Sequence, residues 1–394
     1  MTRHRILFAD QLRGIAALLV VLSHLAGIYW FQPEIVAQVV GGPVPAGPVP
    51  ALAQWLDRLP FDPGAFGVAV FFLISGFVVP LSLQGRPRGA FLRARLWRIF
   101  PTYLAALALG LLVRAVSSAG WGDPLRVHPV ALLPNALLVH DILGISSIDL
   151  VNWTLTVELK FYLLLAFAWP LLARWKAAFV LALALLTLAL NLAATWAVPM
   201  LPLRLGYAMR GLAFEAMLLP FMLLGSLFLL RLRGELGRAA LLATSAGVGA
   251  LSMLAWTGGP MAGSYGAMAP GYLWGWGLFA LCFALRRHAV PQAPLRWLSA
   301  ISYPLYLVHS MLGYALLQLL VQGWGVPYPV ALAAAVVAAL GAAWALHAWV
   351  ERPGMQRQTA SKAGGGIPRA PSFASVCWDR VVAGVRRGPK ASGD

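Results

Sequence analysis

Apolar windows of about 20 residues follow one another along most of this chain. A helix of that length crosses the roughly 30 Å hydrocarbon core of a bilayer. Hydrophobic residues make up 60% of the 394 residues and charged residues 11%, against about 25% charged in soluble domains. The mean hydropathy is +0.76. The sequence therefore predicts an all-α, polytopic membrane protein without a soluble domain of comparable size.

Ten of these windows are predicted to form spanning helices that pack as one bundle. They cover residues 7–30, 64–83, 97–115, 152–173, 176–198, 211–230, 238–256, 268–286, 297–321 and 327–350. A shorter apolar run, 128–143, contains His128, Pro134, His140 and Asp141. Because this run is too short and too polar to span comfortably, we expect a short re-entrant or interfacial helix there.

The arginines predict the orientation of the bundle. Loops on the cytoplasmic side of a membrane carry an excess of Lys and Arg. With the N-terminus inside, the basic clusters within 86–98, 174–176, 231–238 and 286–296 and the basic tail all fall on the cytoplasmic side. The opposite side keeps only Arg58, Arg114, Arg126, Arg204 and Arg210. We therefore expect both termini in the cytoplasm, and a bacterial inner membrane, since the composition is compatible with a GC-rich bacterial genome.

Charge, cysteine content and motifs argue against other classes of protein. The net charge is +17, but the segments between apolar windows are too short to build a module that reads nucleic acid. Neither Cys282 nor Cys377 has a spacing typical of a disulfide framework or a metal site. Residues 6–30 lack a small-residue cleavage site at the usual place, so we expect a retained first helix. No P-loop, GxGxxG or GxSxG motif is present.

The chain is predicted to divide into a transmembrane domain, residues 1–351, and a tail, residues 352–394. The tail is rich in Gly, Ser, Pro and Arg, and we expect it to be basic, mostly disordered and cytoplasmic. Within the tail, residues 376–387 have the pattern of a short basic amphipathic helix lying on the inner leaflet.

The first helix carries charged side chains, which are costly inside a bilayer. Arg13 and His24 are eleven residues apart, close to three helical turns, so they project from nearly the same face about 16 Å apart along the axis. Asp10 precedes Arg13 by three residues and can pair with it. This face therefore offers a cation at one depth and a titratable base at another. The alternatives are an arginine that snorkels to the membrane edge and a structural histidine bonded to a neighbouring helix.

Two further stretches place charged groups at helical positions. Arg95 and Arg98 lie three apart at the cytoplasmic start of a helix, where they can converge on a phosphate or simply follow the positive-inside rule. Glu158 lies about two turns into its helix and must be paired or protonated. We expect it in the outer half of the membrane, near the depth of His24. It can orient the imidazole, hold a substrate hydroxyl, or neutralise Lys160 or an arginine.

One late helix is unusually rich in polar side chains. The stretch 301–310, ISYPLYLVHS, contains Ser302, Tyr303, Tyr306 and His309. We expect His309 to contact substrate or pack against its neighbours rather than to serve as the catalytic base. Glu215 is a second intramembrane acid with Arg210 as a candidate partner, and the sequence assigns it no role.

Five segments together resemble the acyltransferase-3 family of membrane proteins, and they occur in the order found in that family. They are DQLRGIAALLVVLSH, GVAVFFLISGF, RARLWRIFPTY, WTLTVELKFY and ISYPLYLVH. The resemblance implies transfer of an acyl group, often acetyl, from cytoplasmic acyl-CoA to a hydroxyl. It implies an acceptor that is a cell-envelope or exported glycan, a glycolipid or another lipid. Gln11, Thr154 and Thr156 depart conservatively from the family pattern.

The resemblance also implies roles for individual residues. His24 and Glu158 are expected to be catalytic, with His24 acting as general base for the acceptor hydroxyl or carrying the acyl group briefly. The expected substrate-contact residues are Arg13, Arg95, Arg98, Asp10, Trp153, Tyr306 and His309. We expect no metal and no tightly bound cofactor, with acyl-CoA as co-substrate, the bilayer and the acceptor as partners, and no nucleic acid. The mechanism requires Arg13 and His24 to line one continuous passage.

Two other functions fit part of the pattern. Intramembrane His, Glu and Arg also suit the proton relay of a proton-coupled transporter for a sugar or an anion. Transporters usually contain related repeats and broken helices in matching positions, and the sequence shows neither. A non-catalytic assembly partner in envelope biogenesis is the second alternative.

Overall fold

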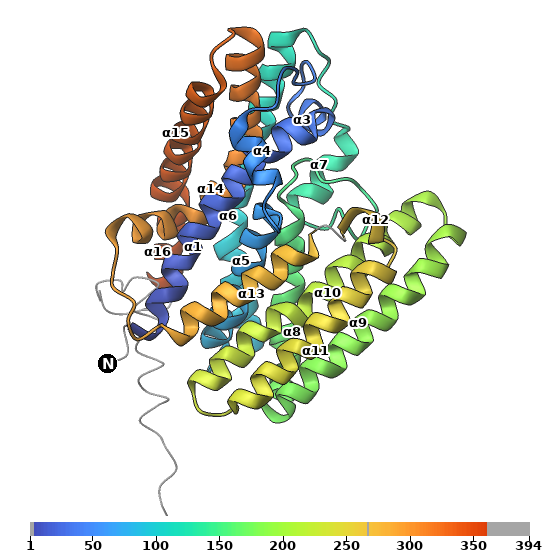
Figure 1. The fold of residues 1–394 in the computed structure, drawn as a ribbon, viewed down its shortest axis with the longest axis vertical. Coiled ribbons are helices and arrows are strands. Elements are labelled where there is room, and N and C mark those ends of the chain that lie inside the picture. Colours follow the sequence, from blue (N-terminus) through green and yellow to red (C-terminus); the bar gives the residue numbers. More distant parts are fainter. Residues whose placement is uncertain (1–3, 266–267, 361–394) are drawn as a thin grey trace, which may run out of the picture.

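The computed structural model describes residues 4–265 and 268–360, and all regular structure in these ranges is helical, with no strand. Long helices lie side by side, and the short helices α3, α4 and α7 gather at the end of the bundle away from the N-terminus (Figure 1). The long helices of the first half are α1 (His4–Leu22), α5 (Pro63–Leu83), α6 (Arg88–Trp121), α8 (Trp153–Trp175) and α9 (Ala177–Ala197). Those of the second half are α10 (Leu203–Leu232), α11 (Arg238–Gly258), α13 (Ala269–Ala284), α14 (Ala293–Leu317) and α15 (Tyr328–Leu346).

Short elements connect or extend the long helices. The short α-helices are α2 (Tyr29–Phe31), α3 (Pro33–Val40), α4 (Ala51–Asp57), α7 (Pro129–Ala136), α12 (Ala262–Tyr265) and α16 (Arg352–Ala360). Three π-helical turns are η1 (Ser23–Ile28), η3 (Gln318–Gly323) and η4 (His347–Glu351), and η2 (Val198–Met200) is a 3₁₀ turn.

The predicted all-α membrane bundle is confirmed. Each of the ten predicted windows is a helix, and nine helices within the described residues are long and apolar enough to cross a membrane. The remaining predicted window is α13, which has 16 residues. At 1.5 Å per residue α13 is about 24 Å long, somewhat shorter than the hydrocarbon core.

The short helix predicted within 128–143 is also present. It is α7, eight residues long, and the chain then runs through turns to Asn152. Val130 and Leu133 on α7 are 61% and 66% exposed, so this helix presents apolar side chains outward although it is too short to span a bilayer.

The first residues of the predicted tail are ordered. Residues 352–360 form α16, which contacts α6. The rest of the tail lies outside the described residues, and with it Cys377 and the amphipathic helix predicted at 376–387.

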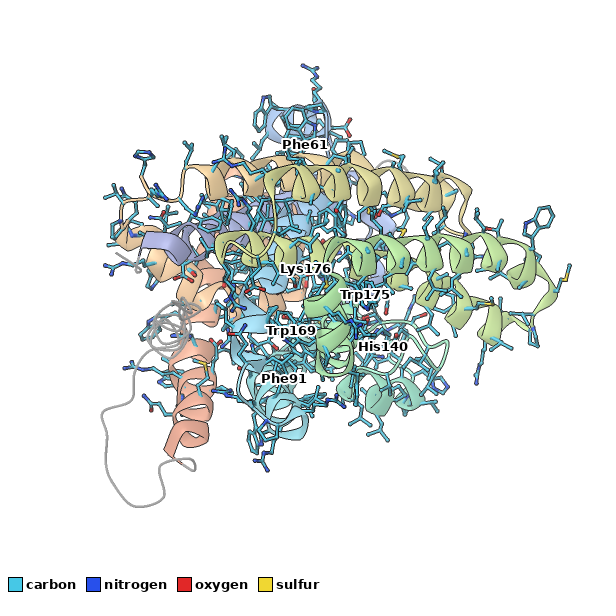
Figure 2. All side chains as sticks on the ribbon, turned by 90° about the horizontal axis from the view of Figure 1, so that it is seen from below. Phe61, Phe91, His140, Trp169, Trp175 and Lys176 are labelled. Atoms are coloured by element: carbon cyan, nitrogen blue, oxygen red, sulfur yellow. The ribbon has the colours of Figure 1, made fainter. Side chains whose placement is uncertain are left out.

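Long segments connect α1 to α5 and α6 to α8, whereas the other long helices are joined by shorter connections. Asp62 caps α5, because its side chain accepts a hydrogen bond from the Ala65 N–H at 2.6 Å. The turn between α8 and α9 consists of Lys176, whose φ is +46°, directly after Trp175 (Figure 2). This turn folds α9 back along α8, and α9, α10 and α11 then form one flank of the molecule (Figure 1).

The centre of the bundle depends on a close approach of α5 to α10. A Cβ atom added at Gly76 would lie 1.8 Å from the Met222 carbonyl oxygen, and one added at Gly225 would lie 2.2 Å from that of Leu73. Ser226 on α10 also donates to the Gly76 carbonyl oxygen at 2.8 Å. Small residues therefore let the two backbones touch, as they do at many helix interfaces in membranes.

Replacing Gly76 by alanine should separate α5 from α10. We expect Gly76→Ala to destabilise the protein by about 1–3 kcal/mol, the usual range for overpacking, and to lower the Tm of the detergent-purified protein. Gly89→Ala is the matched control, since a Cβ added at that helical glycine meets nothing within 4 Å. Equal Tm values for the two variants would contradict this account of the α5–α10 contact.

Candidate functional site

A cavity of about 70 Å³ lies between α1, α5, α6, α8 and α14. Its polar lining consists of Arg13, Ser75, Arg98, Thr154, Glu158, Tyr162, Ser302, Tyr303 and Tyr306. Its apolar lining consists of Val68, Phe71, Phe72, Ile99 and Leu155. Since a water-sized group needs roughly 10–15 Å³, the cavity holds about five such groups. It can therefore admit a slender or small chemical group in its present shape.

Helix α8 supplies the acid of the cavity. Thr154, Glu158 and Tyr162 are four residues apart and so share one face of the helix. The Tyr162 hydroxyl donates to Glu158 Oε1 at 2.5 Å, and the Ser75 hydroxyl donates to the same oxygen at 3.3 Å. These two bonds hold the carboxylate at the wall of the cavity.

Two guanidinium groups line the same cavity. Arg13 makes no ion pair within 4.0 Å among the described residues, but it lies in the field of Asp10 and Glu158, which attract it, and of Arg98, which repels it. Arg98 is paired with Glu351 from the π-helical turn η4, with Nη1 to Oε1 at 3.3 Å. Two arginines and one acid thus line the cavity, and Glu351 adds a second negative charge beside Arg98. The predicted direct pairing of Asp10 with Arg13 is not present.

Arg95 does not reach the cavity, although it lies one helical turn before Arg98. Its guanidinium donates to the Ser82 hydroxyl and lies 5.7 Å from the ring centres of both Phe91 and Tyr162. It is 6% exposed. Arg95 therefore fixes the packing of α6 against α5 and α8, and the two arginines do not converge on one point.

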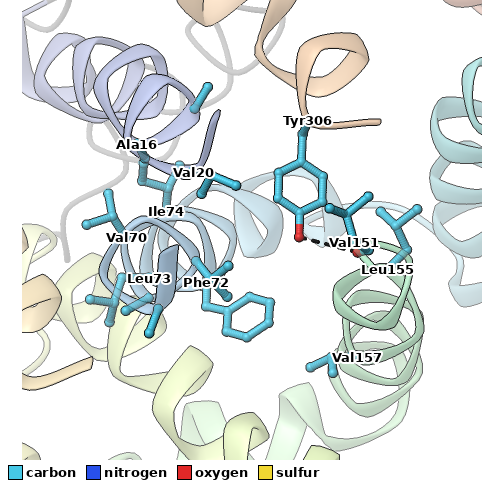
Figure 3. Close-up of a cluster of buried hydrophobic side chains, with 14 of the residues drawn as sticks. Ala16, Val20, Val70, Phe72, Leu73, Ile74, Val151, Leu155, Val157 and Tyr306 are labelled. Carbon is cyan, nitrogen blue, oxygen red and sulfur yellow. Dashed lines mark hydrogen bonds between the residues drawn. The ribbon is translucent and has the colours of Figure 1, made fainter. Parts of the chain in front are cut away.

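Tyr306 closes the cavity where α14 meets the beginning of α8. Its ring lies between α5 and α8, and its hydroxyl donates to the Val151 carbonyl oxygen at 3.3 Å (Figure 3). The same hydroxyl accepts from the Thr154 hydroxyl at 2.8 Å. These bonds attach α14 to the first turn of α8, at Thr154, and to the residues just before it, at Val151.

His24 lies outside the lining of this cavity, in a separate aromatic cluster. Its Nδ1 is 2.8 Å from the Tyr314 hydroxyl, and its ring centre is 4.8 Å from that of His309 in a T-shaped arrangement. His24 is the second residue of the π-helical turn η1. Such turns inside longer helices are frequent at functional sites, because they alter the direction of side chains.

His309 lies between His24 and the cavity. Its Nδ1 is 3.1 Å from the Leu305 carbonyl oxygen and 2.9 Å from that of Tyr306. Since carbonyls only accept, Nδ1 must carry a hydrogen, and the buried Nε2 has no partner among the described residues. The ring centre of Tyr306 is 5.9 Å from that of His309. The continuous passage from Arg13 to His24 is thus not formed as one cavity, and the side chains of Tyr306 and His309 separate its two ends.

The comparisons with known proteins assign the chain to a family. The model of the acyltransferase-3 family, described as an acyltransferase domain, matches residues 6–348. The chain belongs to this family. Nodulation protein 10 of Rhizobium leguminosarum bv. viciae is 35% identical over 155 residues, which are 35% of this chain and 42% of that protein. The chain thus covers less than half of that relative, and no solved structure matches it.

In this member of the family Glu158 lines the cavity together with Arg13, whereas His24 does not line it, contrary to the expectation that Glu158 lies near His24. The end of the segment that leads to α8 is buried in the bundle, at Ile148, Asp149, Val151 and Asn152, and Asp149 accepts there from the buried Ser310 at 2.7 Å. The Asn135 side chain binds the backbone of Ser146 and Ile148 at 3.1 and 2.9 Å. Helix α8 therefore begins within the bundle, and its second turn lies beside Arg13.

A second charged cluster lies on the other face of α8. Lys160 forms ion pairs with Asp141 and Glu215, and Thr156 donates to Glu215 at 2.8 Å. Lys160 therefore does not neutralise Glu158, and Arg210 is not the partner of Glu215. The cluster attaches α8 to α10 and to the turn after α7.

The remaining predicted contact residue is one layer behind the cavity. Trp153 packs against Phe72, a lining residue, at 6.3 Å between ring centres, and against Phe214 at 5.6 Å. Sequence reasoning overlooked Tyr162, Tyr314 and Asp149. Tyr162 stands four residues after Glu158, and that spacing is the signal that could have identified it. No three metal-ligating side chains lie together within the part of the chain that the structure describes.

The acid that docks the 137–152 segment should make stability depend on pH. Burial raises the pKa of Asp149 from 3.8 to about 6, against the opposing hydrogen bonds from Ser310 and two backbone N–H groups. The folded state therefore binds the proton of Asp149 more tightly than the unfolded state does. The free energy of unfolding should fall as the pH rises from about 4 to 6, by roughly 3 kcal/mol at most.

Asp149→Asn removes this titration while keeping an acceptor for Ser310. We expect the difference in Tm, variant minus wild type, to increase as the pH is raised from 4 to 7. The Tm values are measured on detergent-purified protein. Parallel Tm curves over this range would contradict the assignment.

Proposed function

We propose that the protein transfers an acetyl group from cytoplasmic acyl-CoA to a hydroxyl of a cell-envelope or exported glycan or glycolipid, in a bacterial inner membrane with both termini cytoplasmic. The observation that carries this proposal is the cavity with Arg13, Arg98 and Glu158, inside a chain that matches the acyltransferase family over residues 6–348. Its two guanidinium groups suit an anionic donor.

The donor would bind from the side of α6 where Arg98 lies. A guanidinium forms strong, directional hydrogen bonds with phosphate oxygens, and Arg98 is the arginine that combines access to the cavity with a position near the start of α6. The acyl and thioester groups enter the cavity toward Tyr306. A cavity with room for about five water-sized groups favours acetyl over a long acyl chain.

His24 would act as the general base. It takes the proton of the acceptor hydroxyl, and the oxygen attacks the thioester carbonyl carbon. The carbon–sulfur bond then breaks, and the leaving thiolate receives the proton from His24, so that no net proton is consumed. Because Tyr306 and His309 separate the cavity from His24 in this structure, their side chains must move for donor and acceptor to meet. Glu158 acts at the donor end of the site, beside Arg13, and does not orient His24.

The alternative, a proton-coupled transporter, rests on the same intramembrane His, Glu and Arg residues. The family match favours the enzyme over the transporter. Membranes containing the protein, incubated with radiolabelled acetyl-CoA, test the choice. Label in the glycan or lipid fraction supports acyl transfer, whereas substrate flux into vesicles without labelling supports transport.

His24→Ala should reduce acetyl transfer by about 10²–10⁴-fold, the usual contribution of a general base. The measurement is the initial rate of label transfer at matched protein amounts in the membrane. His288→Gln, a change at an exposed histidine, is the control and should retain full activity. Wild-type turnover in His24→Ala would remove His24 from the mechanism.

Arg98→Gln should raise the KM for acetyl-CoA by about 10-fold or more, since a hydrogen bond to a charged group contributes roughly 1.5–3 kcal/mol. Arg93→Gln removes a neighbouring but exposed arginine from the same helix and should leave KM unchanged. The same rise in both variants would indicate a general effect of positive charge and contradict a specific role for Arg98.

A further inference from the structure

The end of α6 nearest Trp121 holds a buried cation that no carboxylate neutralises. Arg114 is 8% exposed, its Nη2 donates to the Arg126 carbonyl oxygen at 3.0 Å, and its Nε has no partner. Among the described residues no acid lies within ion-pair distance of Arg114. Asp123, the acid nearest in sequence, accepts from the Gly42 N–H at 2.8 Å instead. A buried, unpaired guanidinium is costly, so a bound anion would complete this site.

Two hydroxyls lie on the same face of α6. Ser117 and Ser118 follow Arg114 by three and four residues, and both Oγ atoms are buried without a partner. A helical serine commonly bonds to the carbonyl one turn back, but neither of these does. The segment that follows α6 binds both parts of this face, since the Arg126 carbonyl accepts from Arg114 and the Asp123 N–H donates to the Ser118 carbonyl oxygen at 2.8 Å.

The segment 41–43 covers this turn without supplying an acid. Gly41 packs so closely on Ser118 that an added Cβ would lie 2.2 Å from Oγ. The Gln318 side chain donates to the Pro43 carbonyl oxygen at 2.7 Å. The hydroxyl of Ser118 is therefore enclosed by protein rather than exposed on a surface.

We propose that Arg114, Ser117 and Ser118 form a binding site for a tetrahedral oxyanion, that is, a phosphate or sulfate group. A guanidinium with a free N–H and two hydroxyls supplies several donors to one anion. In the proposed orientation this end of α6 lies on the acceptor side of the membrane, opposite the donor-binding Arg98. The anion therefore belongs to a group carried by the acceptor or to the headgroup of a lipid. Binding at this site goes beyond the proposed function and does not require acyl transfer.

The test uses the full-length protein, purified in neutral detergent without phosphate or sulfate, at constant ionic strength set with chloride. Inorganic phosphate and phosphatidylglycerol are added separately, and diacylglycerol serves as the lipid without a phosphate. We expect at least one phosphate-containing probe to raise the Tm saturably in the wild type. Arg126→Gln should respond equally, because it removes an exposed charge and keeps the carbonyl that Arg114 uses, whereas Arg114→Gln should not respond.

The pattern of responses identifies the source of the anion. Stabilisation by phosphatidylglycerol alone supports a lipid headgroup, and stabilisation by inorganic phosphate supports a group on the acceptor. If Arg114→Gln does not fold, the double change Ser117→Ala and Ser118→Ala keeps the charge and should weaken apparent affinity several-fold. The proposal is overturned if neither phosphate-containing probe raises the Tm of the wild type, which is the result expected of a site that holds only water. It is also overturned if the Tm of Arg114→Gln or of the double variant responds to the probes like that of the wild type.

Discussion

The docking of residues 137–152 into the helix bundle is the interaction on which the candidate site depends. Irregular backbone is tolerated at membrane depth only where protein satisfies its polar groups. Asn135 and Ser310 do so here, by binding the backbone of this segment and the carboxylate of Asp149. Because the end of the segment, 148–152, is buried against α14, α8 begins next to α14, and Glu158 lines the cavity with Arg13.

The charges around the cavity follow from the cost of leaving ions unpaired in an apolar environment. Glu351 neutralises Arg98, and Lys160 is shared by two acids on the far side of α8. Arg13 and Glu158 line the cavity without a direct counter-ion among the described residues. A substrate phosphate that approached Arg98 would therefore compete with Glu351, whereas Arg13 is available to an anion without that competition.

The site consists of two parts that this structure keeps separate. The cavity holds the residues suited to an anionic donor, and the cluster of His24, Tyr314 and His309 holds the imidazoles. Tyr306 touches both parts, since it lines the cavity and its ring lies against His309. Tyr306 and His309 are therefore the side chains whose movement would join the two parts without a movement of whole helices.

The sequence by itself determined the helices, the membrane environment and the family. Window length and apolar composition decide whether a segment spans a bilayer, and both are local properties. Spacing along one helix predicted less, since Arg13 and His24 are about three turns apart on α1, yet of the two only Arg13 lines the cavity. Only the tertiary structure decided which helices those faces meet. Arg95 and Arg98 lie one turn apart, yet one binds Ser82 and the other Glu351. Glu215 pairs with Lys160 rather than with Arg210, although Arg210 is nearer to it in the sequence. The partner of a charged residue in a bundle depends on which helices cross, and crossing helices bring together residues that are far apart in the chain.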